Sequence, residues 1–166
     1  MTNKQYQIIL GLDPGLANLG YGLIKENKNN LEIIKAGAIK TAATLNNAER
    51  LLIIHRELTK IIKKYQPDKI ASEELFFCKN VKTALTVGQV IGVILLTASQ
   101  ARLPLYQFTP LEIKQALTTY GKADKKQLAL MVKLLLKLDK INFPSHATDA
   151  LACAICCAQT KQWIKN

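Results

Sequence analysis

The chain has 166 residues with no repeat, low-complexity tract or linker, so a single domain spanning residues 1–166 is expected. No apolar run reaches the roughly 18 residues of a membrane span and the N-terminus has no signal-peptide pattern, so we expect a cytoplasmic protein without a membrane partner. Its 23 basic and 12 acidic residues give a net charge of +11, which favours nucleic acid as the partner, although lysine enrichment for solubility alone would produce the same excess.

The first three predicted elements are strands of an antiparallel meander. Tyr6–Asp13 is apolar on both strand faces, as a central strand is, and Pro14 and Gly15 then turn the chain. Strands over Leu19–Lys25 and Leu31–Lys40 follow, and a short polar segment joins them. The meander therefore ends near residue 40.

The rest of the chain is predicted to alternate between helix and strand. After Asn46 and Asn47, both plausible N-caps, apolar residues recur at helical spacing until Pro67 ends the helix. The later elements are strands over Lys69–Leu75 and Leu103–Phe108 and helices over about Asn80–Arg102, Pro110–Thr119, about Lys125–Leu138 and His146–Ile164. This order predicts an α/β fold, in which a mixed five-stranded sheet, the meander plus two parallel strands, is covered by helices on both faces.

The long helix predicted over about Asn80–Arg102 is apolar on most sides. A helix of that kind is either buried in its own domain or half buried against a partner. Gly88 and Gly92 lie four residues apart, a spacing that lets two such helices approach closely. We favour a homodimer across this helix, and a plain core helix is the alternative.

Four positions at the ends of predicted elements carry acidic or imidazole side chains. Asp13 ends the first strand, where a charged carboxylate needs cations, donors or water, although an aspartate that only caps the turn is equally compatible. Glu73 and Glu74 end a later strand on opposite faces, and the apolar pattern does not choose between them. His146 and Asp149 lie three apart on one face of the last helix, where both also fit an ordinary surface role.

Carboxylates with one imidazole form a ligand set for divalent cations such as Mg²⁺ or Mn²⁺, and many nucleases use two such ions to cut phosphodiesters. The glycines around Asp13 are expected to leave the surface bare so that a nucleic-acid backbone can approach. They are Gly11, Gly15, Gly20 and Gly22. A zinc site from Cys153 and Cys156 with the nearby histidine is disfavoured, because zinc ligands normally lie on a loop or knuckle.

The segments IILGLDPGLANLGYGLI, SEELFFCKN, LEIKQALTTYGKADKKQ and SHATDALACAI resemble, in order and spacing, the motifs of the RuvC family of Holliday junction resolvases. The resemblance extends over nearly the whole chain. It implies a ribonuclease H-like fold and a homodimer that binds four-way junction DNA in recombination and DNA repair. It further implies symmetrical, metal-dependent nicking with two Mg²⁺ ions per site, and RuvA and RuvB as branch-migration partners. Mn²⁺ is expected to support cleavage as well.

Carried over by position, the resemblance makes Asp13, Glu73 and Asp149 catalytic metal ligands and so prefers Glu73 to Glu74. His146 falls where the family has aspartate or histidine, as a metal ligand or a proton shuttle. The DNA contacts expected are Phe76, Lys79, Lys114, Lys122, Lys125 and Lys126. Phe76 would stack on unpaired bases, with a core position as the alternative. A YqgF-type nuclease acting on RNA or other DNA is the second candidate, and a non-catalytic nucleic-acid binder the third.

Overall fold

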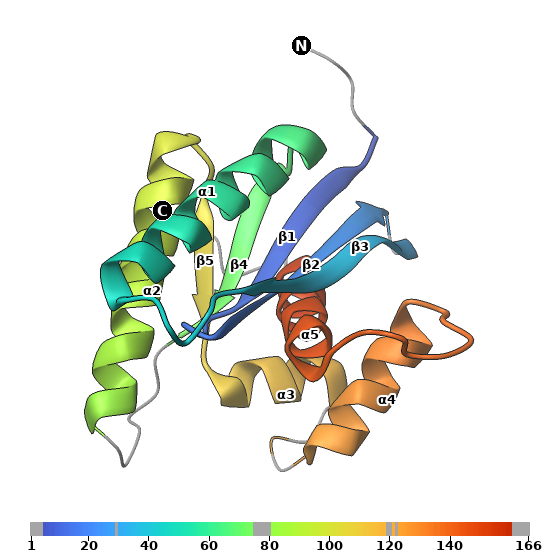
Figure 1. Cartoon of the computed structure of the whole chain (residues 1–166). Helices are drawn as coiled ribbons and strands as arrows, with labels where there is room; N and C mark the ends of the chain where they lie inside the picture. Colours follow the sequence, from blue (N-terminus) through green and yellow to red (C-terminus); the bar gives the residue numbers. More distant parts are fainter. Residues whose placement is uncertain (1–4, 29, 75–80, 119–120, 122, 161–166) are drawn as a thin grey trace.

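The computed structural model describes residues 5–28, 30–74, 81–118, 121 and 123–160. In this part of the chain, five strands form one sheet in the order β3-β2-β1-β4-β5 (Figure 1). The strands are β1 (Gln7–Asp13), β2 (Asn18–Asn27), β3 (Asn30–Lys40), β4 (Lys69–Glu73) and β5 (Leu105–Phe108). Pairing is antiparallel within β1–β2–β3 and parallel for β1–β4–β5, which confirms the predicted mixed sheet.

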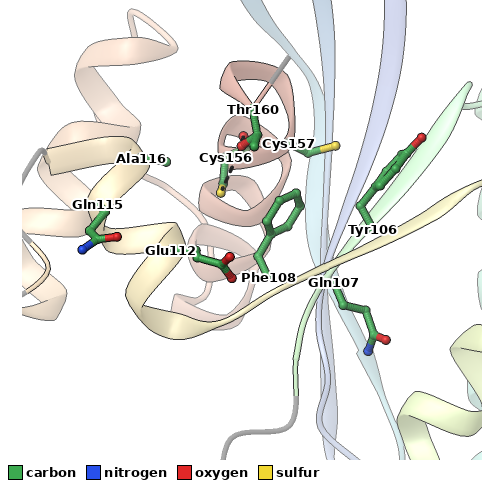
Figure 2. Close-up of a pocket in the computed structure, with 9 residues that line it drawn as sticks. All are labelled: Tyr106, Gln107, Phe108, Glu112, Gln115, Ala116, Cys156, Cys157 and Thr160. Atoms are coloured by element: carbon green, nitrogen blue, oxygen red, sulfur yellow. Dashed lines mark hydrogen bonds between the residues drawn. The ribbon is translucent and has the colours of Figure 1, made fainter. Parts of the chain in front are cut away.

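Helices cover both faces of the sheet, as predicted (Figure 1). They are α1 (Asn47–Tyr65), α2 (Val81–Gln100), α3 (Pro110–Thr118), α4 (Lys125–Leu135) and α5 (Ser145–Gln159). One core lies between the sheet and α1 with α2, around Leu10, Leu58 and Ile94. The other lies under α5, with α3 and α4 packed around that helix. Beside the edge strand β5, the α3 and α5 helices border a groove (Figure 2).

Side-chain caps fix where three of these helices begin. At the start of α3, the Glu112 carboxylate accepts from the Thr109 N–H at 2.7 Å and the Thr109 hydroxyl accepts from the Glu112 N–H at 3.2 Å. Asn46, rather than Asn47, is the N-cap of α1: its side chain accepts from the Glu49 N–H at 3.0 Å, and the Glu49 carboxylate accepts from the Asn46 N–H at 2.9 Å. Asp124 and Gln127 make the equivalent reciprocal pair at the start of α4. Capping boxes of this kind satisfy backbone donors that the helix itself leaves unpaired. The first helical residue of α4 is thereby Lys125, directly after its N-cap Asp124.

Gly11, Gly20 and Gly22 clear space for α5, so the expectation that these glycines let DNA approach is wrong. A Cβ added at Gly11 would collide with the Ala150 carbonyl, and one at Gly20 with the His146 carbonyl. At Gly22 it would lie 2.7 Å from the Leu151 side chain. At Gly15 it would meet the Asn18 carbonyl within the turn. The missing side chains let α5 lie directly on β1 and β2.

Gly11→Ala should therefore destabilise the protein by about 3 kcal/mol or more, because overpacking against a helix backbone is costly. Urea unfolding measures the change. Gly37→Ala is the matched control: its Cβ would meet the ring of Tyr21, a side chain that can shift, so its cost should be clearly smaller. Equal stability of the two variants would mean that α5 is not held close to β1.

The helix α2 presents much of its apolar surface to solvent. Thr83–Gln100 has 18 residues with a mean hydropathy of 1.4, so by length and composition it could cross a membrane. The expectation that no segment reaches that limit is wrong on this measure. Length and composition do not distinguish a membrane span from a core or contact helix of a soluble protein. Leu85, Leu95 and Leu96 are 66%, 46% and 56% exposed.

Candidate active site

Strand alternation places Asp13 and Glu73 on the face of the sheet that α5 covers. Ile9 and Ala71 pack in the core under α5, and alternate residues of a strand share a face. Leu12 and Ser72 are paired in the parallel ladder of β1 and β4, so the residues that follow them lie side by side. Glu74 is solvent-exposed on the other side of this alternation. The structure thus gives a physical reason for preferring Glu73, which parity alone left open.

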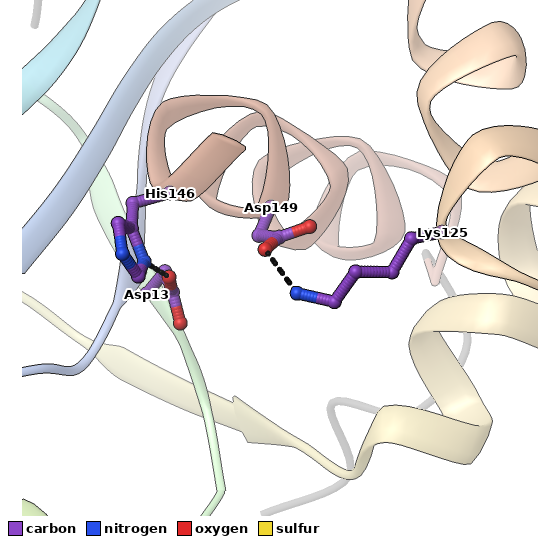
Figure 3. A network of polar contacts seen from close by, with 4 residues as sticks. All are labelled: Asp13, Lys125, His146 and Asp149. Atoms are coloured by element: carbon purple, nitrogen blue, oxygen red, sulfur yellow. Dashed lines mark hydrogen bonds and ion pairs between the residues drawn. The ribbon is translucent and has the colours of Figure 1, made fainter. Parts of the chain in front are cut away.

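The start of α5 carries His146 and Asp149, and it lies over the ends of β1 and β4, near Asp13 and Glu73. The His146 Nδ1 atom lies 2.7 Å from Asp13 Oδ2, and the Asp149 Oδ2 atom lies 3.3 Å from Lys125 Nζ on α4 (Figure 3). The Asp13 side chain is 18% exposed and that of His146 is 45% exposed. We call Asp13, Glu73, His146 and Asp149 the acidic cluster. Its members come from β1, β4 and α5.

Burial and neighbouring negative charge oppose the ionisation of Asp13 and Glu73. Burial raises the pKa of Asp13, and the charge of Asp149 raises it further, while the hydrogen bond from His146 opposes the shift. Burial, then the charges of Asp13 and Asp149, raise the pKa of Glu73 to about 7. Lys125 and Lys114 offset only part of this increase. Because a bound cation offsets both burial and the repulsion between carboxylates, such a site favours binding a cation.

The donor set of the acidic cluster fits divalent ions of the Mg²⁺ or Mn²⁺ type. It offers three carboxylates and one imidazole, and hard oxygen donors are what these ions prefer. Within the described residues, no three His, Cys, Asp or Glu side chains are already arranged around one point as a metal shell. The direct contacts are instead pairwise: Asp13 with His146, and Asp149 with Lys125. Donor type and charge therefore support metal binding here, while the side-chain geometry gives no coordination shell.

Two of the predicted DNA contacts lie near the acidic cluster. Lys114 on α3 and Lys125 on α4 both lower the pKa of Glu73, so their ammonium groups act within its electrostatic range. Lys126 is exposed beside Lys125 at the start of α4. The other predicted contacts, Phe76, Lys79 and Lys122, lie outside the described residues. The lysines that can be placed are thus available to phosphate at this edge of the sheet.

The cysteines of α5 are buried behind the site. Cys153, Cys156 and Cys157 are free thiols, and burial raises the pKa of each, to about 11 for Cys156 and Cys157. A thiol binds metal as its thiolate, and that form is disfavoured here. These side chains therefore belong to the core under α5.

Sequence reasoning named the members of the acidic cluster but missed how they pair. Asp13 and His146 are 133 residues apart in the chain, and no local pattern links them. The pairing of Lys125 with Asp149 was missed for the same reason, since 24 residues separate them. The first contact follows from the position of α5 over β1, and the second from the packing of α4 against α5.

Comparisons with known protein families, sequences and structures all match most of the chain, and the family match includes the acidic cluster. The family described as "Crossover junction endodeoxyribonuclease RuvC" matches residues 9–157. A protein of that name from Halothermothrix orenii is 53% identical over 149 residues, covering 90% of each chain. One from Roseiflexus is 50% identical, covering 89% of this chain and 88% of its own. The structure titled "T. thermophilus RuvC in complex with Holliday junction substrate" has a TM-score of 0.85 at 33% identity, covering 90% of this chain and 92% of its own.

Proposed function

The chain belongs to the RuvC family of crossover junction endodeoxyribonucleases, and on that premise we propose that the acidic cluster is its catalytic site. It has the ribonuclease H-like fold of that family and resolves Holliday junctions in homologous recombination and DNA repair. The observation that best supports the site is the side-by-side placement of Asp13 and Glu73 beneath the first turn of α5. RuvC, the first of the two nuclease families considered from the sequence, is the family whose model matches residues 9–157.

In this proposal the side chains of the acidic cluster hold two Mg²⁺ ions, and Mn²⁺ can replace them. The bound ions supply the Lewis-acid chemistry that activates water and stabilises the leaving 3′ oxygen, so that the product carries a 5′-phosphate. When Asp13 is ionised, its Oδ2 accepts a hydrogen bond from Nδ1 of His146, which leaves Nε2 to accept a proton or bind a cation. Lys114 and Lys125 neutralise phosphate charge beside the reacting bond.

The test compares a mobile four-way junction with a linear duplex of the same arms, in Mg²⁺, Mn²⁺ or EDTA. We expect nicking of the junction only, at symmetrical positions, and no product in EDTA. Mn²⁺ should support cleavage at least as well as Mg²⁺, because the imidazole of His146 is a softer ligand than a carboxylate. Equal cleavage of junction and duplex would contradict the proposed substrate, and clearly better cleavage in Mg²⁺ would contradict the role given to His146.

We propose that the enzyme is a homodimer across α2, because symmetrical nicking of two strands needs two sites. At helical spacing, Leu85, Gly88, Gly92 and Leu96 share one exposed face of α2. A Cβ added at either glycine would meet nothing within 4 Å in the single chain. The face is thus apolar and open to close approach by a second α2.

A cytoplasmic location and docking to RuvA and RuvB complete the proposal, and they rest on family resemblance alone.

Leu96→Glu should convert the dimer into a monomer, because it places a charge within the proposed apolar contact. Light scattering on the eluted protein measures the mass directly. Leu130→Glu is the matched control, since Leu130 on α4 is 54% exposed against 56% for Leu96. Loss of the dimer in both variants, or in neither, would argue against α2 as the contact.

A further inference from the structure

The groove beside the edge strand β5 has no part in the proposed nuclease site. Its volume is about 440 Å³ (Figure 2). Residues of three elements line it: Tyr106 and Phe108 of β5, Glu112 and Ala116 of α3, and Cys156 of α5 together with Thr160 just beyond that helix. Strand β5 is at the end of the sheet, so one side of its backbone has no strand partner in the described part of the chain.

The chemistry of the groove favours an aromatic occupant with a nearby positive charge. Two aromatic rings and a thiol give it an apolar wall, and Glu112 adds a carboxylate at its rim. One oxygen of that carboxylate accepts from the Thr109 N–H at 2.7 Å and from its hydroxyl at 2.8 Å. No basic side chain is among the described residues that line the groove. Phosphate is therefore a poor ligand here, and a cationic segment with an aromatic side chain is a good one.

The described part of the chain ends at this groove. Helix α5 ends at Gln159, and the Thr160 N–H donates to the Cys156 carbonyl as the backbone leaves the helix. Thr160 lines the groove, and the sequence continues as KQWIKN, residues 161–166. This segment carries the only tryptophan of the chain, Trp163, between Lys161 and Lys165. In extended form, three residues span about 10 Å, so Trp163 is within reach of the groove wall.

We propose that residues 161–166 dock in the groove of the same chain, with the Trp163 ring against Tyr106 and Phe108 and a lysine near Glu112. Docking removes the apolar wall of the groove from contact with solvent. It also shields the open edge of β5 from pairing with other chains. The lysines complement the one carboxylate of the groove. The assignment is independent of the nuclease proposal, since none of these residues belongs to the acidic cluster.

Quenching of Trp163 fluorescence by acrylamide tests the docking in the full-length protein without DNA. A free peptide of sequence TKQWIKN is the reference for full exposure. If the segment is docked most of the time, the quenching constant of the protein should be at least about threefold below that of the peptide, since it scales with the undocked fraction. Equal quenching of protein and peptide would overturn the proposal. Protection that disappears on dilution would also overturn it, because it would place the segment in the groove of a second copy.

Two variants connect the protection to this groove. Ala116→Phe fills the groove and should raise the quenching constant to the peptide value. Glu112→Gln keeps an N-terminal cap, because glutamine also serves in a capping box, and should raise quenching partway while removing most of its dependence on salt. Ala101→Phe is the matched control in a second cavity of about 460 Å³ at the end of α2, and it should change nothing. Protection unaffected by both Ala116→Phe and Glu112→Gln would show that Trp163 is buried elsewhere.

Discussion

Asp13→Asn is expected to abolish junction cleavage while junction binding stays close to wild type. The carboxylate sits where β1 ends, paired with His146 at 2.7 Å and within electrostatic range of Glu73 and Asp149. Its loss removes one of the negative charges that, in the proposed function, hold the metal ions. A loss of about 4 kcal/mol in transition-state stabilisation corresponds to a rate lower by a factor on the order of 10³.

The measurement separates cleavage from binding. Single-turnover cleavage of a labelled junction gives the rate, and a gel shift of the same junction in Ca²⁺ or EDTA gives the affinity. Binding should persist, because the substitution leaves the lysines untouched and removes one acidic charge from a protein of net charge +11. Glu74→Gln is the matched control: Glu74 is an exposed carboxylate on the other side of the strand alternation. Residual cleavage above about a tenth of wild type would contradict the central role of Asp13.

The order of elements was predictable from the sequence because local signals determine it. The Asn46 cap, the helical apolar spacing and Pro67 place α1 within one or two residues of its observed bounds, Asn47–Tyr65. Strand periodicity also gave the meander and the parallel strands. Signals of this kind lie within a few residues of the structure they specify, so one sequence is enough to interpret them.

Contacts between distant elements were not predictable in the same way. Gly20 and Gly22 were interpreted as clearance for DNA, whereas α5, more than 100 residues later in the chain, fills that space. The choice of Glu73 over Glu74 depended on family resemblance, because it requires knowing which face of β4 the last helix covers. The solvent exposure of α2 was equally hidden, since a buried helix and a contact helix have the same composition.

Glu73→Gln is expected to abolish cleavage and, in EDTA, to make the protein more stable at pH 8. The pKa of Glu73 in the folded chain is about 7, above its ordinary value of 4.5, because burial and the charges of Asp13 and Asp149 oppose its ionisation. Between these two values the unfolded chain releases this proton while the folded chain keeps it. The contribution of Glu73 to stability is thus fully present below pH 4.5 and is lost as the pH rises to about 7.

Glutamine does not ionise, so the variant should not show this loss. After allowance for the partial exposure of Glu73, the gain at pH 8 is on the order of 1 kcal/mol, or about 2–4 °C in Tm for a chain of this size. Thermal unfolding in EDTA at pH 5 and pH 8 measures it, with Glu74→Gln as the exposed control. The variant and wild type should differ at pH 8 and converge towards pH 5.

The same substitution distinguishes a metal ligand from a buried acid with no other role. Adding Mg²⁺ should raise the Tm of the wild type, because an ion that binds only the folded chain stabilises it, and should raise that of Glu73→Gln much less. Cleavage by the wild type should fall as the pH drops below about 7, where Glu73 takes up a proton, and higher Mg²⁺ should move the midpoint to lower pH. A variant with unchanged Tm at pH 8 and an undiminished response to Mg²⁺ would remove Glu73 from the site. A gain in stability accompanied by loss of cleavage would instead mean that the folded chain retains a destabilising carboxylate because catalysis requires it.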